Sequence, residues 1–265
     1  MNNDFLEPVA GIAHRAGDAI LEIYAGDFDV ETKRDESPVT AADMAAHRII
    51  VAELAELTPG LPILSEEAAA TPWEERRHWD SYWLVDPLDG TREFIKGNGE
   101  FTVNIALVQG GRPIIGVIHA PVLGQSWLGC DGVGAFRQER HQEPVAIQPS
   151  RPARQPPRVL VSRSHAGPEI EAMLDRLGQC ERIAAGSSLK FCRIAEGAAD
   201  FYPRTGTTCE WDTAAGQGIL EAAGGKVLDR DGRPLRYNRQ AGLENPHFLA
   251  FADGERDWLG LLNDS

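Results

Sequence analysis

The chain has 265 residues, of which 42% are hydrophobic and 25% charged, so it can bury a sizeable core as one large domain or two modest ones. Forty acidic and 26 basic side chains give a formal net charge of -14, which argues against nucleic acid as a partner. We therefore expect a globular protein in which the surplus of carboxylates needs an explanation.

The sequence shows no pattern typical of export or of a membrane span. Asp4 and Glu7 interrupt the apolar residues near the start, unlike a secretory leader. Arg112 and Pro121 break the most apolar stretch, around 101–130, so no transmembrane segment is expected. The four cysteines are widely spaced without a CxxC pair, which disfavours a disulfide framework. We expect a cytoplasmic protein and leave peripheral association with the cytoplasmic face of the inner membrane as an alternative.

The first half of the chain predicts two helices followed by a sheet. Apolar residues recur at three- and four-residue steps from Phe5 to Tyr24 and from Met44 to Leu57, as on amphipathic helices. Thr40, three residues before Asp43, resembles a capping box at the start of the second helix. Short apolar runs then predict strands with antiparallel character at 61–64, 82–85, 102–108, 114–119, 126–128 and 134–137.

The amino-acid composition changes between Pro144 and Pro157, where five prolines disfavour helices and central strands. We place a domain boundary there, with an N-terminal α+β domain at 1–150 and a C-terminal α/β domain at 151–265. Beyond the boundary strands and helices alternate, which indicates an α/β layer arrangement. The predicted elements are 158–161, 169–177, 182–184, 188–196, 199–202, 213–223 and 226–228.

The most informative segment begins where the apolar run 82–85 ends. Asp86 and Asp89 follow it three residues apart, bent by Pro87 and released by Gly90, so that both acids and the Thr91 hydroxyl can converge on one point. Hard divalent cations such as Mg²⁺ prefer such oxygen ligands. A polar turn between a strand and a loop is the alternative, since Asp, Pro and Gly are common in turns.

Two further acidic positions follow apolar segments. Glu66 and Glu67 come directly after the run 61–64, and Asp212 lies at the expected start of a helix. A helix cap would account for Asp212, and solvation for the glutamates. Together with Asp86 and Asp89 they nevertheless indicate a site for one or more metal ions, because close carboxylates otherwise repel one another. Walker, GxGxxG, EF-hand, GxSxG, HExxH and aspartyl-phosphate phosphatase motifs are not present.

These residues resemble a known family, the magnesium-dependent and lithium-sensitive phosphatases that include inositol monophosphatase. Asp86 to Thr91 matches its DPxDGT signature, and Trp211 to Gly216 matches its WDxAAG signature. The resemblance implies a layered αβαβα sandwich of α+β and α/β character, the sugar-phosphatase fold. The segments 37–43, 82–96, 99–107, 162–166 and 186–192 are most similar to its bacterial 3'(2'),5'-bisphosphate nucleotidase branch.

By this resemblance, two or three Mg²⁺ ions are held by carboxylates and one backbone carbonyl: Glu66, Asp86, Asp89, Asp212 and the carbonyl of Leu88. Asp43 and Thr91 would position the attacking water with Glu66, and Glu67 would be the weaker member of its pair. The implied substrate-binding residues are Glu66, Leu88, Asp89, Gly90, Thr91, His165, Ser187, Ser188, Lys190, Arg204 and Asp212. For the last group alternatives stay open, because a Ser-Ser pair commonly caps a helix and a lone Lys, Arg or His is often an exposed charge.

The expected activity is hydrolysis of 3'-phosphoadenosine 5'-phosphate to AMP and phosphate in sulfur assimilation, with its sulfated relative as a further substrate. No covalent enzyme intermediate is needed, because metal-assisted phosphoryl transfer depends on positioning and charge stabilisation. An inositol or sugar monophosphatase with the same metal site is one alternative. A catalytically silent nucleotide sensor is another, and the oligomeric state is left open.

Overall fold

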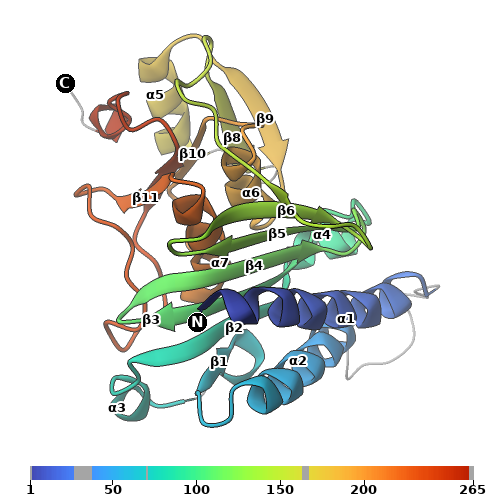
Figure 1. Ribbon diagram of the computed structural model, residues 1–265. Coiled ribbons are helices and arrows are strands. Elements are labelled where there is room, and N and C mark those ends of the chain that lie inside the picture. The colour runs from blue at the N-terminus through green and yellow to red at the C-terminus, as the bar shows by residue number, and fades with distance from the viewer. Residues whose placement is uncertain (1, 27–37, 70, 163–166, 263–265) are drawn as a thin grey trace.

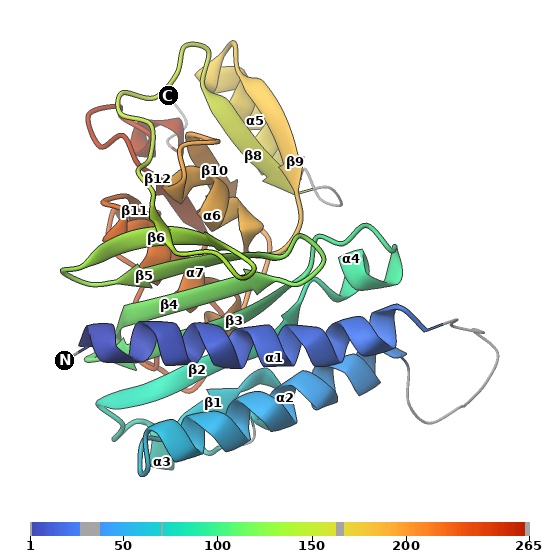
Figure 2. The same cartoon turned by 45° about the vertical axis from the view of Figure 1, so that its right-hand side comes forward.

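The computed structural model describes residues 2–26, 38–69, 71–162 and 167–262. Its layers run helix, sheet, helix, sheet, helix, as Figures 1 and 2 show from two directions. This arrangement is the αβαβα sandwich that the resemblance implied. No helix in the described ranges is long and apolar enough to cross a bilayer. The cytoplasmic location stays a prediction.

The first layer consists of α1 (Leu6–Tyr24), preceded by the 3₁₀ turn η1 (Asn2–Phe5), and α2 (Pro38–Leu57). Their apolar faces pack on one side of a seven-stranded sheet, in a cluster that includes Val9, Ile20 and Leu54. The predicted capping box at Thr40 is wrong. The helix already begins at Pro38, whose fixed φ suits a first helical turn, so Thr40 lies inside it.

The seven strands of the second layer follow one another in chain order, β1 to β7. The pair β1–β2 is parallel and the others are antiparallel. Between β1 and β2 lie η2 (Glu66–Ala68) and α3 (Trp73–Arg76), and α4 (Thr91–Ile95) follows β2. The strands are β1 (Ile63–Ser65), β2 (Ser81–Asp89), β3 (Thr102–Gln109), β4 (Arg112–Ala120), β5 (Gln125–Cys130), β6 (Gly134–Glu139) and β7 (Val145–Ala146).

The second sheet has the order β11-β12-β10-β8-β9. It comprises β8 (Arg158–Ser162), β9 (Glu181–Ala185), β10 (Phe201–Arg204), β11 (Lys226–Asp229) and β12 (Phe248–Phe251). Two strands had not been predicted. The two-residue β7 pairs with β6 at the sheet edge, where prolines are tolerated, and β12 is a buried four-residue run between two paired neighbours.

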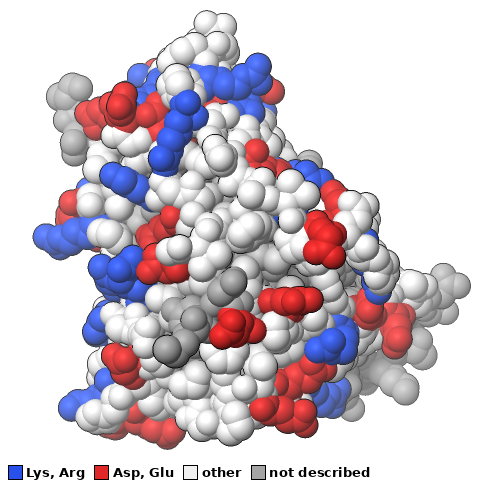
Figure 3. Space-filling view, in the orientation of Figure 1, with Lys and Arg blue, Asp and Glu red and all other residues white. Residues whose placement is uncertain are grey.

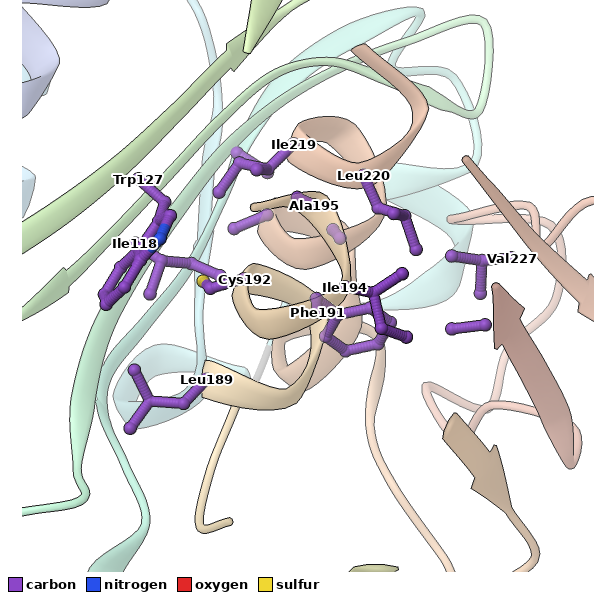
Figure 4. Packing of buried hydrophobic residues seen from close by; sticks show 14 of the residues in the cluster. Ile118, Trp127, Leu189, Phe191, Cys192, Ile194, Ala195, Ile219, Leu220 and Val227 are labelled. Carbon is purple, nitrogen blue, oxygen red and sulfur yellow. The ribbon is translucent and has the colours of Figure 1, made fainter. Parts of the chain in front are cut away.

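The helices α6 (Leu189–Ala195) and α7 (Glu210–Ala222) fill the space between the two sheets. Figure 4 shows Cys192 beside Ile118 of the first sheet, with Phe191 on the side of Val227 of the second. On the outer face of the second sheet lie α5 (Pro168–Leu177) and η3 (Leu259–Leu262). Because one buried cluster contains residues from both halves, the predicted division at residue 150 separates the sheets but not the core, and two domains stay a prediction.

Glycines let α7 approach the first sheet closely. A Cβ on Gly116 would overlap the carbonyl oxygen of Ala215, and one on Gly129 would lie 2.5 Å from the Cα of Ile219. The helix begins at Glu210, three residues before the predicted start, because Asp212 completes its first turn by accepting a hydrogen bond from the Cys209 N–H. This packing brings Asp212 to the end of β2.

Candidate active site

A β-bulge at the end of β2 turns two carboxylates toward the same side of the sheet. Asp86 pairs with Asn104 and Asp89 with Thr102, so two residues of β2 oppose the single residue Val103 of β3. In a regular strand, residues three apart face opposite sides. Because of the extra residue, the Leu88 side chain lies in the hydrophobic cluster beneath α1 and α2. Asp86 and Asp89 both face the layer of α6 and α7.

Gly90 ends the bulge and allows α4 to begin at Thr91. Its φ is +96°, in the left-handed region that favours glycine. A Cβ at this position would also lie 3.2 Å from the Glu100 carbonyl oxygen. The sequence Asp-Gly-Thr therefore reverses the chain within one residue and leaves Thr91 at the edge of the site.

Asp86, Asp89 and Asp212 form one carboxylate cluster. One oxygen from each lies within 4.8 Å of the others. Burial and the charge of Asp89 raise the pKa of Asp86 well above its ordinary value, and the same two causes raise that of Asp212 to about 7. Asp212 both caps α7 and faces the cluster, so the two interpretations of this residue are compatible.

Two more acids approach the cluster from the side of the first helical layer. Glu66 shares a hydrogen bond with Asp86, and desolvation together with the charge of Asp89 raises its pKa. Asp43, on α2, is buried and hydrogen-bonded to Glu67, and its Oδ1 has no partner. Burial followed by the charge of Glu67 raises the pKa of Asp43.

The donor set fits a divalent cation. Its centre consists of oxygen atoms on the buried Asp86 and the half-buried Asp89 and Asp212, whose mutual repulsion raises several pKa values, and one buried oxygen of Asp43 lacks a hydrogen bond. Hard cations such as Mg²⁺ take such oxygen ligands and relieve this repulsion. On the face in Figure 3, other acids are scattered among basic residues, so a share of the charge of -14 is ordinary surface.

A cleft of about 760 Å³ opens next to the cluster. Asp89 and Asp212 lie in its wall with Thr91 of α4, and residues of β8, β10 and α6 continue the wall into the second sheet. Lys190 and Arg204 supply positive charge there. Apolar contributions come from Val161, Ile170, Phe191, Tyr202 and Phe248.

Two cationic side chains of this wall, Lys190 and Arg204, are held by backbone carbonyls. Lys190 Nζ donates to the oxygens of Ala185 (3.2 Å) and Ser187 (2.6 Å), and burial lowers its pKa to about 8. Arg204 donates to the carbonyls of Gly206 and Thr207. Both cations are therefore fixed in place beside the cleft.

Ser188 lies in the cleft wall but does not cap α6 with its side chain, so the capping interpretation is wrong for this residue. It precedes α6 but makes no side-chain capping bond. Its N–H donates to Asp89 Oδ2 (2.6 Å) and its hydroxyl to Asn104 Oδ1 (2.7 Å). Thr102 and Asn104 were missed at the sequence level, although two polar side chains inside the apolar run of β3 were a usable signal.

The structure therefore brings together, in the wall of the cleft or in the carboxylate cluster beside it, most of the predicted site residues. They are Asp43, Glu66, Asp86, Leu88, Asp89, Gly90, Thr91, Ser187, Ser188, Lys190, Arg204 and Asp212. No described hydrogen bond joins Asp43 to Thr91, so that pairing stays a prediction. His165 lies outside the described residues. The role of each residue is taken up below as a proposal.

Known proteins match nearly the whole chain. Residues 1–256 match the model of the inositol monophosphatase family. The 3'(2'),5'-bisphosphate nucleotidase CysQ of Escherichia coli K12 is 49% identical over 245 residues, covering 92% of this chain and 98% of the relative. The protein of that name from Haemophilus influenzae is 36% identical over 99% of this chain and 98% of its own length.

Solved structures agree in fold. CysQ from Bacteroides thetaiotaomicron superposes with a TM-score of 0.83 at 45% identity, covering 94% of this chain and 98% of that one. An inositol monophosphatase from Anabaena gives a TM-score of 0.76 at 26% identity, with coverages of 98% and 95%.

Proposed function

This chain belongs to the inositol monophosphatase family, and we propose that it is a metal-dependent 3'(2'),5'-bisphosphate nucleotidase. The observation that carries the proposal is the cluster of Asp86, Asp89 and Asp212, which borders a cleft of about 760 Å³ with Lys190 and Arg204 in its wall. With cations bound at the carboxylates, such a site can hold a phosphate monoester, and Lys190 and Arg204 can hold a second anionic group. Two relatives with the nucleotidase name match this chain over more than nine-tenths of its length.

The metal ligands in this proposal are the carboxylates of Glu66, Asp86, Asp89 and Asp212 and the carbonyl oxygen of Leu88. The ion is Mg²⁺, in two or three copies. When bound, the cations neutralise the phosphate and lower the pKa of water, which provides a nucleophile near neutral pH. The bulge supports this assignment because it points Asp86 and Asp89 to the same side.

The protein's own groups orient the water and the phosphate. Glu66, Asp43 and Thr91 are proposed to hold the attacking water; Asp43 has a buried oxygen without a partner, and Thr91 lies on the cleft wall. A water that donates to a carboxylate keeps a lone pair directed at phosphorus. Water then attacks phosphorus directly, the bond between phosphorus and the 3'-oxygen of the nucleotide breaks, and that oxygen leaves with a proton, so no covalent enzyme intermediate is required.

Substrate selection is proposed to come from the second sheet and α6. Lys190 and Arg204 are fixed by carbonyls beside the cleft, so positive charge is preorganised for the 5'-phosphate. Ser187, Ser188 and His165 complete this group in the proposal, and Glu66, Leu88, Asp89, Gly90, Thr91 and Asp212 surround the reacting phosphate. The substrate is 3'-phosphoadenosine 5'-phosphate, which yields AMP, and its sulfated relative is a second substrate.

Phosphate release from 3'-phosphoadenosine 5'-phosphate and from inositol 1-phosphate, measured side by side with Mg²⁺ and with EDTA, tests the proposal. We expect the nucleotide to be hydrolysed with the higher kcat/KM and EDTA to abolish turnover. Faster hydrolysis of inositol phosphate would show a monophosphatase instead. Binding of the nucleotide without release of phosphate would identify a silent sensor and refute the enzymatic assignment.

A further inference from the structure

We propose that Asn104 is a positioning residue, which with Ser188 holds Asp89 in the orientation that the metal site requires. The inference rests on the proposed function, because it assigns a task toward the metal ions of that site. It concerns two residues that lie on different layers: Asn104 on β3 of the first sheet, and Ser188 at the entrance to α6. Both are almost fully buried, with exposed fractions of 1% and 2%.

Ser188 and Asn104 each donate a hydrogen bond to the same oxygen of Asp89. The Ser188 N–H lies 2.6 Å from Oδ2, and the Asn104 Nδ2 lies 3.4 Å from the same atom. Neither of these bonds engages Oδ1. A carboxylate held through one oxygen presents the other in a fixed direction, which is the condition for a metal ligand of defined geometry.

Hydrogen-bond chemistry fixes which way the Asn104 amide points. An ionised carboxylate only accepts, so the amide NH₂ must face Asp89 and the amide oxygen must face away. On that other side, Asn104 Oδ1 accepts the Ser188 hydroxyl at 2.7 Å. The Thr102 hydroxyl lies 2.8 Å from Ser188 Oγ and 3.0 Å from Asn104 Oδ1, so it can donate to either.

When Thr102 donates to Ser188 Oγ, the hydrogen bonds form a continuous chain. Thr102 donates to Ser188, Ser188 donates to Asn104, and Asn104 donates to Asp89. All three side chains are buried, where a polar group without a hydrogen-bond partner is costly. If the Asn104 amide were flipped, its oxygen would face the Asp89 carboxylate, so that two acceptors would lie against each other. Whichever acceptor Thr102 uses, the Asn104 amide faces Asp89 with its NH₂ group, and Asp89 is held from two sides.

The arrangement also makes the position of Asp89 depend on how α6 packs against β3. Asp89 is attached to β2 through the chain, to β3 through Asn104 and to α6 through Ser188. A purely structural role for Asn104, joining β3 to α6, is the competing explanation. The two explanations differ in whether loss of Asn104 changes metal affinity or only stability.

The experiment measures Mg²⁺ affinity by isothermal titration calorimetry, together with the melting temperature without and with saturating Mg²⁺. The variants are Asn104→Ala, Ser188→Ala and the control Gln109→Ala. Gln109 is the matched control because it is an amide on the same strand that also bonds a serine, Ser81, at 3.2 Å, but it lies at the exposed end of β3.

We expect Asn104→Ala to weaken Mg²⁺ binding roughly 10- to 100-fold, as removal of groups that orient metal ligands does elsewhere. The rise in melting temperature with Mg²⁺ should shrink accordingly, and Gln109→Ala should bind like the wild type. Ser188→Ala keeps its N–H bond to Asp89 and loses only the bond that orients Asn104, so a smaller weakening of roughly threefold or more is expected.

An Asn104→Ala protein that melts lower but binds Mg²⁺ within twofold of the wild type would overturn the inference and leave the proposed function intact. Where Asn104→Ala does not fold, Ser188→Ala decides, and unchanged affinity in that variant overturns the inference equally. A wild-type protein that binds no Mg²⁺ would instead refute the proposed function on which the inference rests.

Discussion

Substitution of His119 by Asn is expected to make the stability of this fold less sensitive to acid. His119 lies on β4 beneath α1, with 1% of its surface exposed. Its Nδ1 contacts Ser126 Oγ (2.9 Å) and the Gln125 carbonyl oxygen (3.2 Å), and its ring lies 4.6 Å from that of His14. Burial and the neighbouring His14 lower its pKa from 6.5 to about 3, with Asp18 opposing and Arg140 reinforcing the shift.

The magnitude follows from the difference between the folded and unfolded chains. Below pH 6.5 the unfolded chain binds a proton at His119, and the folded protein does not until the pH approaches 3. Stability from this group is therefore complete above pH 6.5 and is lost as the pH falls toward 3. At pH 5 the loss is 1.5 pH units at 1.36 kcal/mol each, or about 2 kcal/mol.

The assay is urea unfolding of wild type and His119→Asn at pH 7 and pH 5, in EDTA so that metal occupancy does not vary. Asn retains a donor near the Nδ1 position, and the lost ring volume lowers stability equally at both pH values. The wild type should lose about 2 kcal/mol more than the variant between pH 7 and pH 5. Parallel losses, equal within about 0.5 kcal/mol, would refute the assignment of this acid sensitivity to a neutral buried His119.

Three further changes address the site itself. Asp89→Asn removes one charge of the carboxylate cluster. The kcat should fall more than about 100-fold, while the melting temperature in EDTA should not fall. Near-normal turnover would contradict the metal assignment. Gly90→Ala strains a residue with φ of +96°, so urea unfolding should show a loss of about 1 to 2 kcal/mol, and an unchanged stability would show that the turn tolerates a Cβ. Arg204→Gln should raise KM for the bisphosphate roughly tenfold with little change in kcat, and an unchanged KM would place the 5'-phosphate elsewhere.

Local sequence patterns identified much of the fold correctly. The periodicity of α1 and α2 and the apolar runs of β2 to β6 depend on which side of each element is buried, and that information is written in neighbouring residues. Short elements escaped the same reasoning. The strand β7 has two residues and lies in a proline-rich segment, and it exists because β6 offers an edge to pair with.

The convergence of the acidic residues was predicted from the sequence, but the backbone geometry that produces it was not. Asp86 and Asp89 are three apart on one strand, a spacing that normally points side chains to opposite faces, and only the bulge against Val103 makes them converge. Ser188 was expected either to bind substrate or to cap a helix. Its partners, Asn104 and Asp89, are 84 and 99 positions away in the chain, beyond the reach of any local pattern.

The two short motifs at 86–91 and 211–216 indicated the phosphatase family through their resemblance to its signatures, and the acidic residues in them indicated a metal site because hard cations prefer oxygen ligands. Tertiary structure alone decided that Asp212 meets Asp86 and Asp89, since glycines on β4 and β5 let α7 pack close enough to deliver it. It also decided that Asn104 faces Asp89. Contacts between distant segments depend on how layers pack, and packing is a property of the whole chain.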